Sequence, residues 1–294
     1  MAKNYVLSCC STADLGRERL LERGIPALCF HYTLDGEERR DDGNRESLRS
    51  FYQAMREGKS TSTSMVSVGE YLEFFSAFLE EGKDVLHVCL SGGLSGTCGA
   101  ARQAAALLCE QYPQQRVLIV DSLAASAGCG LLVDTMAQLR AEGMTIDALY
   151  AWAEEHKRRL QHWFFSTDLS AYIRGGRISK TAGAFGGMLG ICPLLHMNAE
   201  GKLVAGEKIR SKRRVIAEIV ERMAACAENG TDYAGRCFLS HSDCAEDAKA
   251  VAELVERRFP RLDGPVEIFD IGTAIGSHTG LGTVALFFFG KERE

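Results

Sequence analysis

The sequence predicts an α/β protein in which mostly parallel or mixed sheets are covered by helices. Two observations carry this prediction. Short apolar segments such as 84–90 and 116–121 are nearly continuous, which is typical of strands buried on both faces. Segments with helical periodicity separate these strands along most of the 294 residues. We therefore expect two α/β domains, residues 1–160 and 161–294, with a ligand site in the cleft between them.

Several elements of the first half carry a recognisable boundary signal. Gly24 ends the first expected helix, and a hairpin is expected through Asp35 and Gly36. Ser67, three residues before Glu70, predicts a capping box, and Thr145 is a further expected N-cap. The expected strands are 4–10, 25–34, 84–90 and 116–121, and the expected helices are 15–24, 45–58, 68–82, 96–112, 128–143 and 145–161.

The second half continues the alternation but includes a strand pair. Residues 191–197 and 201–209 are two apolar runs joined by a short polar turn, which predicts a hairpin. The other expected strands are 162–166, 236–241, 266–272 and 283–290, and the expected helices are 168–176, 211–228 and 245–259.

The charge pattern argues against nucleic acid as the principal partner. The net charge is −5, and the basic residues are scattered. The densest basic cluster is RSKRR at 210–214, which opens a helix of otherwise mixed charge. The cluster is interpreted either as solvated surface charge or as a docking site for an acidic partner, with Arg210 as the candidate docking residue.

The cysteines predict a reducing compartment. There are eleven, with no C-x-x-C pair and no regular spacing, and several lie in apolar periodic segments. This pattern argues against a disulfide framework and against a zinc site, so we expect no metal and no cofactor. The apolar run before Asp14 is too short for a signal peptide, and we expect the protein to be cytoplasmic.

Two uncharged stretches are long enough to span a bilayer but have a different expected role. Residues 181–199 and 271–290 are interrupted by many glycines and polar residues, and the first also contains Pro193. We expect them to be buried or to line a ligand site. Their apolar residues are candidates for contact with an apolar ligand: Phe185, Met188, Leu189 and Phe287.

Three hydroxyl-rich loops are expected on one edge of the first sheet. They are STSTSMVS at 60–67, SGGLSGT at 91–97 and DSLAASAG at 121–128. The second follows a buried strand and precedes a helix, where loop amides and the helix dipole favour an anionic group. The absence of an acidic cluster around these loops favours recognition of a small anion over metal binding.

Familiar phosphate and nucleophile motifs do not explain the SGGLSGT loop. A Walker phosphate loop needs a lysine after its last glycine, and none follows here. A serine-hydrolase elbow needs G-x-S-x-G, but Thr97 stands where the second glycine belongs. The one dinucleotide-like run, at Gly280, leaves too few residues for an acidic ribose partner.

A histidine and an arginine lie among glycines in the second half. His278 stands in GSHTGLG, which we expect to be a loop where the backbone approaches a ligand closely. Arg177 stands in RGGRISK between glycine-driven turns, and its interpretation is an anion clamp or a docking contact for a partner.

Taken together, these segments resemble the DegV family of bacterial fatty-acid-binding proteins. SGGLSGT resembles the family's S-S-G-L-S-G-T, and TSMVSVGEY resembles its T-S-Q-P-S-x-x-E-F/Y with Met65 and Val66 replacing Gln-Pro. LSAYIRGGRIS resembles L-x-x-L-x-x-G-G-R-I-S, and IGSHTGLG resembles I-G-x-H-x-G-P-G. The resemblance covers nearly the whole chain in the family's order.

The resemblance implies a carrier rather than an enzyme. Its members hold a long-chain fatty acid in a tunnel between two α/β domains and present the carboxylate to an ATP-dependent fatty acid kinase subunit, which makes acyl-phosphate for lipid synthesis. It implies no catalytic residue here and only transient membrane contact for lipid exchange. The carboxylate-binding residues would be Thr63, Ser95 and His278 with the amide of Gly96, supported by Ser64, Thr97, Ser122 and Ser126.

Two other functions stay open at this point. One is a hydrolase or transferase that uses Ser95 as nucleophile with His278 as base. The other is a regulatory lipid sensor whose surface, rather than its cargo, is the output.

Overall fold

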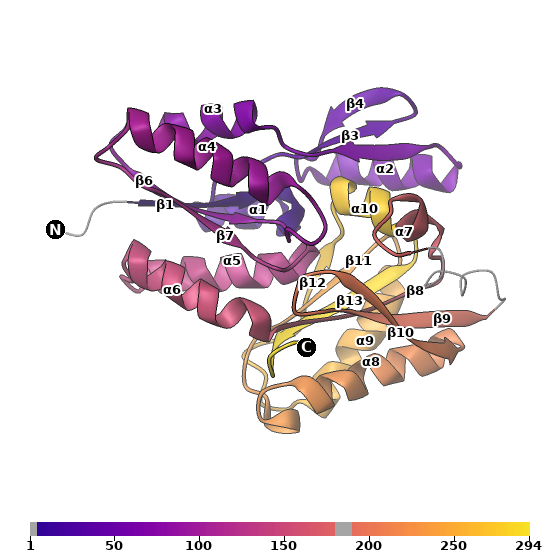
Figure 1. Ribbon diagram of the computed structural model, residues 1–294. Coiled ribbons are helices and arrows are strands. Elements are labelled where there is room, and N and C mark those ends of the chain that lie inside the picture. The colour runs from indigo at the N-terminus through magenta and orange to yellow at the C-terminus, as the bar shows by residue number, and fades with distance from the viewer. Residues whose placement is uncertain (1–4, 180–189) are drawn as a thin grey trace.

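The computed structural model describes residues 5–179 and 190–294, and it confirms the α/β prediction (Figure 1). Strands and helices alternate along most of the chain and form three sheets. The predicted division at residues 160 and 161 stays a prediction. None of the helices in the described ranges is long and apolar enough to cross a bilayer.

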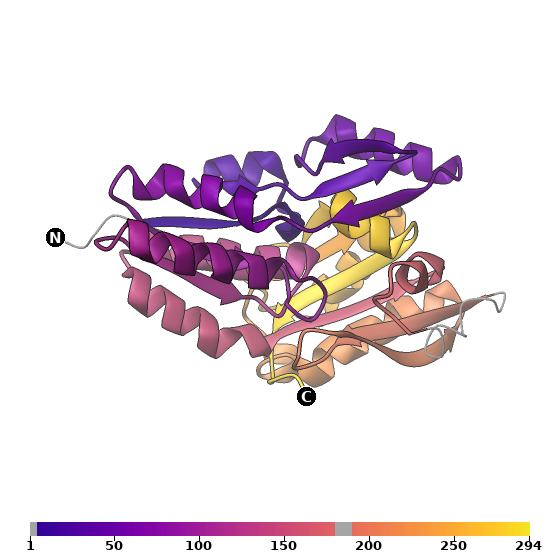
Figure 2. The same ribbon diagram turned by 45° about the horizontal axis from the view of Figure 1, so that its top comes forward.

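The first sheet is wholly parallel, with strand order β2-β1-β6-β7. Every residue of β6 is buried, which explains its continuous apolar sequence. Helices α3 and α4 cover one face and α5 and α6 the other (Figure 2). The strands are β1 (Tyr5–Cys10), β2 (Ala27–Leu28), β6 (Asp84–Cys89) and β7 (Val117–Asp121); the helices are α1 (Gly16–Glu22), α3 (Val68–Leu79), α4 (Thr97–Gln111), α5 (Ser126–Ala141) and α6 (Ile146–His156).

A small antiparallel sheet of order β4-β3-β5 differs from the sequence-based expectation. Residues 25–34, expected as one strand, are split between β2 in the first sheet and β3 in this one, because the chain crosses from one sheet to the other at Cys29–Phe30. Residues 60–67, expected as a loop, contain β5. The hairpin through Asp35 and Gly36 is confirmed, with φ values of 53° and 88°. The elements are β3 (His31–Leu34), β4 (Glu37–Arg40), β5 (Thr61–Ser64) and α2 (Arg45–Arg56).

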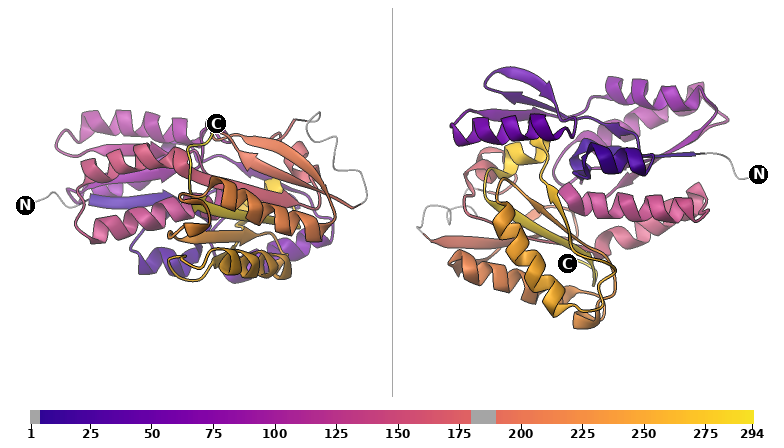
Figure 3. Two further views of the ribbon diagram at one scale, coloured as in Figure 1. Left: turned by 90° about the horizontal axis from the view of Figure 1, so that it is seen from below. Right: turned by 180° about the vertical axis from the view of Figure 1, so that it is seen from behind.

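The sheet of the second half is mixed, with order β10-β9-β8-β13-β11-β12. Only the β11–β12 pair is parallel, and the expected hairpin of β9 and β10 is present. Helices α8 and α9 cover the outer face (Figure 3). The elements are β8 (Leu160–Ser166), α7 (Ser170–Arg174), β9 (Ile191–Met197), β10 (Leu203–Arg210), α8 (Lys212–Cys226), β11 (Cys237–His241), α9 (Ala245–Arg258), β12 (Glu267–Asp270) and β13 (Thr283–Phe289).

Helix α10 (Thr273–Thr279) corrects a prediction. His278 was expected in a loop because glycines surround it, but it lies in the last turn of this helix. Gly280 follows as C-cap with φ of 69°, so its positive φ ends the helix rather than opening a ligand loop. Three single-turn helices complete the fold: η1 (Ser11–Ala13), η2 (Lys157–Arg159) and η3 (Gly230–Asp232).

Helix α5 joins the two halves, because it packs against the first sheet and also against β8, β11 and β13 of the second. Its residues 126–134 are all buried. At Gly128 the approach is close: a Cβ placed there would lie 2.3 Å from His162 Nε2 and 2.6 Å from Phe287 Cδ1. Glycine is therefore required for this helix to reach the second sheet.

A buried carboxylate on α5 adds an ionic connection between the halves. Asp134 has no exposed side-chain area and accepts hydrogen bonds from Arg23 Nε at 2.9 Å and from the Arg236 guanidinium. Arg236 also donates to Glu267 at 2.7 Å. These two arginines lower the pKa of Asp134 despite its burial.

Candidate functional site

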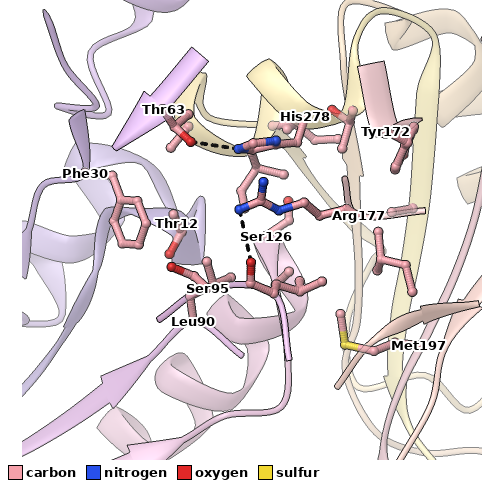
Figure 4. Close-up of a pocket in the computed structure, with 18 of the residues that line it drawn as sticks. Thr12, Phe30, Thr63, Leu90, Ser95, Ser126, Tyr172, Arg177, Met197 and His278 are labelled. Carbon is pink, nitrogen blue, oxygen red and sulfur yellow. Dashed lines mark hydrogen bonds between the residues drawn. The ribbon is translucent and has the colours of Figure 1, made fainter. Parts of the chain in front are cut away.

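A cavity of about 360 Å³ lies between the two halves (Figure 4). Its volume falls within the range of about 300–1,000 Å³ that is usual for small-molecule sites. One group of polar lining residues is linked by contacts: Thr63 bonds to His278, Arg177 lies beside His278, and Arg177 bonds to Leu94 next to Ser95. We call this group, together with Ser64 and Gly96, the polar end of the cavity. The apolar wall combines both halves and includes Phe30, Leu90, Phe164, Tyr172, Met197, Leu203, Ala285 and Phe287.

Thr63 and His278 form the best-defined polar pair of the cavity. Strand β5 and helix α10 pack together and bring Thr63 Oγ1 within 2.7 Å of His278 Nε2 (Figure 4). His278 Nδ1 is buried and has no hydrogen-bond partner within the described residues. In the tautomer protonated at Nε2, the imidazole donates to Thr63 Oγ1 and leaves the threonine proton free to point into the cavity.

His278 is neutral at neutral pH in this environment. Its burial, together with the positive charges of Arg177 and Arg174, lowers its pKa to about 4. The guanidinium of Arg177 lies between His278 and the SGGLSGT loop and donates to the Leu94 carbonyl at 3.1 Å (Figure 4). Burial lowers the pKa of Arg177 as well, but a guanidinium stays charged. The polar end therefore carries a net positive charge.

Ser95 is backed by a buried hydroxyl, as Thr63 is backed by an imidazole. Ser95 Oγ lies 2.9 Å from Thr97 Oγ1 and accepts a hydrogen bond from the Thr97 amide at 3.3 Å. When the Thr97 hydroxyl donates to Ser95, the Ser95 proton is free for a ligand. Thr97 itself is fully buried and lies outside the cavity lining, so it supports Ser95 from behind.

The two glycines that precede Ser95 serve close packing, Gly92 against Asp121 of the first half and Gly93 against the second half. A Cβ at Gly93 would lie 2.6 Å from the Glu200 carbonyl oxygen in the β9–β10 turn. Ser91 Oγ donates to the Gly201 carbonyl in the same turn at 2.8 Å. The glycine-rich start of the loop is thus explained by close packing, and only its last residues face the cavity.

The other predicted hydroxyls have different positions. Ser64 lines the cavity but is exposed, and Ser122 is buried outside the lining, where it bonds to Ala124. Ser126 lines the cavity, but its hydroxyl donates to Asp14 at 2.5 Å and also meets Ser240 at 3.0 Å. Ser126 therefore has its proton already engaged, which makes it a weaker candidate donor than Thr63 or Ser95.

The predicted apolar contacts can be placed only in part. Phe287 lines the cavity and packs edge-on against His162, with ring centroids 5.1 Å apart. Phe185, Met188 and Leu189 lie outside the described residues. Arg210 ends the edge strand β10, where it is exposed and does not line the cavity; its docking role stays a prediction.

Several lining residues were missed by sequence reasoning. Phe164, Tyr172 and Met197 reach the cavity from the second half, and Phe30 and Leu90 from the first. Met197 lies in the stretch 181–199 that was expected to be buried or to line a ligand site, whereas the other four stand in or beside segments predicted only as strands or helices. Alternation of side chains along each strand could have identified them, because one face of each strand turns toward the other half. The sequence does not say which face that is.

The nucleophile–base pair of the hydrolase alternative is not formed. Across residues 5–179 and 190–294, the Ser95 hydroxyl pairs with Thr97 while His278 Nε2 pairs with Thr63. A serine nucleophile needs its base within hydrogen-bond reach. The geometry favours ligand binding by the two hydroxyls.

Comparison with known proteins adds to this picture. A family profile described as "Uncharacterised protein, DegV family" matches residues 10–291. The chain is similar to a DegV domain-containing protein of Clostridium perfringens, with 36% identity over 293 residues and 99% of each chain covered. A counterpart in Lactococcus lactis is 31% identical over 284 residues, with 96% of each covered. Among solved structures, a DegV family protein of Thermus thermophilus described as binding fatty acid is 27% identical, with a TM-score of 0.85 over 98% of this chain and 100% of that one.

Proposed function

Because this chain belongs to the DegV family, we propose that it binds a long-chain fatty acid in the cavity between its two halves. The description of the Thermus thermophilus protein as fatty-acid-binding supports the proposal. The observation that carries it is the cavity itself, whose apolar wall adjoins two hydroxyls, one backed by the buried Thr97 and the other by the partly buried His278.

The polar end suits a carboxylate better than other anions. Thr63 and Ser95 supply two O–H donors, and the amide of Gly96 lies at the N-cap of α4, where the helix dipole favours negative charge. Hydrogen bonds to a charged group contribute about 1.5–3 kcal/mol each. The positive charge of Arg177 attracts a carboxylate. A phosphate, with its higher negative charge, is usually held by several cations, and Arg177 is the one arginine or lysine in the described cavity lining.

The acyl chain supplies most of the affinity in this proposal. A buried methylene contributes about 0.8 kcal/mol, so a chain of roughly fifteen contributes on the order of 12 kcal/mol before the costs of binding. The rings of Phe164, Tyr172 and Phe287 offer matching apolar surface. The head group then sets the orientation of the ligand and contributes a smaller part of the affinity.

The cavity is oriented so that the carboxylate lies near the surface. Met65 lines the polar end and is 48% exposed, and Gly96 beside it is also exposed. The buried ring of His162 also lines the cavity and packs edge-on against Phe287. A second protein could therefore reach the carboxylate while the chain stays buried.

We further propose that the protein is a non-catalytic carrier in the cytoplasm. It would take up fatty acid in transient contact with a membrane and present the carboxylate to an ATP-dependent fatty acid kinase subunit, which forms acyl-phosphate for lipid synthesis. The accessible polar end supports this role, and Arg210 is the candidate docking residue. All eleven cysteines are free, in keeping with a reducing compartment.

Mass spectrometry of an organic-solvent extract tests the binding. Purified protein should release about one long-chain fatty acid per chain, as expected for a single site. An extract without fatty acid, together with no uptake of added fatty acid, would exclude the proposal.

Two substitutions test the head-group residues. Thr63→Val keeps the side-chain shape and Ser95→Ala nearly so, and each should lower fatty-acid affinity by about 10- to 100-fold through one lost charge-assisted hydrogen bond. Ser62→Ala is the matched control, because Ser62 is an exposed hydroxyl of the same strand. Acyl-phosphate formation with ATP and the kinase subunit should fall in the same two variants. Unchanged affinity in both would remove Thr63 and Ser95 from the head-group role.

A further inference from the structure

A second group of chemically reactive side chains lies inside the first sheet. Cys10 ends β1, and His87 and Cys89 lie on the neighbouring strand β6. The pairing of Cys9 with Val88 places Cys10 and Cys89 at adjacent positions of the ladder, on the face covered by α3 and α4. All three side chains are fully buried, and their sulfur and ring nitrogen atoms lie within 4.8 Å of one another.

We propose that Cys10, His87 and Cys89 form a binding site for Zn²⁺. Zinc binds thiolate sulfur at about 2.3 Å and imidazole nitrogen at about 2.0–2.1 Å, so two such ligands at the tetrahedral angle are about 3.5 Å apart. The distance from Cys10 Sγ to His87 Nε2 is 3.5 Å. This pair of donor atoms already has the spacing of tetrahedral zinc ligands, and Cys89 Sγ lies within 4.8 Å of both.

The orientation of His87 is that of a metal ligand. Its Nε2 faces Cys10 while its Nδ1 lies 2.9 Å from Ser8 Oγ, an outer partner of the kind that fixes the tautomer of a ligating histidine. Edge-on contacts with the rings of Tyr71 and Phe75, at 5.4 and 5.3 Å, hold the imidazole plane. The ring is thus positioned without any rearrangement of the backbone.

Further polar atoms surround the group. Cys98, in the first turn of α4, belongs to the same buried cluster but lies outside the group of three donor atoms, so the set within the described residues is Cys₂His. The Tyr71 hydroxyl lies 3.3 Å from Cys10 Sγ and 3.9 Å from Cys89 Sγ, where it can donate to the thiolates. Binding releases the thiol protons, and the thiolate charges offset that of the ion.

The site was invisible to sequence reasoning, which predicted no metal. Zinc sites are recognised in sequence by ligands spaced a few residues apart, whereas Cys10 and His87 are 77 residues apart and meet only because β1 and β6 pair. Since the site lies in the core, zinc would enter as the chain folds. The proposal does not depend on fatty-acid binding.

Cobalt substitution and metal analysis test the site. The full chain refolded with Co²⁺ should show thiolate-to-metal charge transfer, and chain purified from zinc-containing medium should hold about one zinc ion. Cys10→Ser and Cys89→Ser should lose the zinc, whereas Cys109→Ser, which removes an exposed thiol of α4, should keep it. Ser8→Ala leaves every ligand in place and should weaken zinc binding by about 10- to 100-fold.

Three results would overturn the proposal. They are a Co²⁺ spectrum without thiolate charge transfer, an equal zinc loss in Cys109→Ser, and peptide mapping that finds Cys10 and Cys89 joined in a disulfide. Because the cobalt spectrum is recorded on the unmodified chain, it decides the matter even if the cysteine variants do not fold.

Discussion

Substituting Gly128 with alanine tests how closely α5 must approach the second sheet. The new Cβ would lie 2.3 Å from His162 Nε2 and 2.6 Å from Phe287 Cδ1, far inside an ordinary contact. Overpacking of this kind costs about 1–3 kcal/mol. Gly99→Ala is the matched control, because Gly99 is a helical glycine of α4 with open space at its Cβ position. Both variants gain about 0.8–1 kcal/mol of helix propensity, so the difference between their free energies of unfolding measures the cost of the close approach at Gly128.

Urea unfolding of the two variants measures this difference directly. We expect Gly128→Ala to be less stable than Gly99→Ala by about 1–3 kcal/mol. His162 and Phe287 line the cavity, so the rings that give way move into the ligand space. Affinity for the longest fatty acid should then fall about fourfold for each methylene excluded, with little change for shorter acids. Equal stability of the two variants together with equal chain-length preference would refute this account of α5.

Three further predictions concern stability. Asp134→Asn weakens a buried ionic cluster that holds Arg23 and Arg236, and it should lower the free energy of unfolding by about 3–5 kcal/mol; a loss below half of that in urea unfolding would contradict the assignment. The pKa of His278 is about 4 in the folded protein and about 6.5 in the unfolded chain, so the free energy of unfolding should fall as the pH drops from 6.5 to 4. His278→Gln should remove about 1–2 kcal/mol of that fall, after allowance for solvent screening. Parallel pH profiles of the two proteins would contradict this prediction. Ser67→Ala removes the capping box with Glu70 and should cost about 1 kcal/mol, seen as a lower Tm, whereas an unchanged Tm would show that the cap is dispensable.

Most of the fold could be predicted because its signals are local. Continuous apolar strands, helical periodicity and the caps at Ser67 and Thr145 all appear in the structure. The errors arise where local signals conflict with tertiary structure. The polar run at 61–64 is a strand because β3 pairs with it, and His278 is helical despite its neighbouring glycines because α10 packs against β3, β5 and α7.

The candidate site divides in the same way. Thr63, Ser95, Gly96 and His278 could be selected because hydroxyls and glycines at the ends of apolar segments form a pattern along the chain. The residues that contact these four in the folded protein could not be predicted in the same way. The contact of Thr63 with His278 joins positions 215 residues apart, and the apolar wall depends on which face of each strand meets the other half.

The placement of the cavity between the halves has a thermodynamic consequence. A ligand that touches both halves contributes its binding energy to their association, by RT ln(1 + [L]/Kd) at free ligand concentration [L]. The reverse must hold by the same linkage. A change that weakens the junction, at Asp134 or where Ser91 meets Gly201, should lower ligand affinity although none of these residues lines the cavity. A partner that separates the halves would therefore favour release of a bound ligand, and one that holds them together would favour its retention.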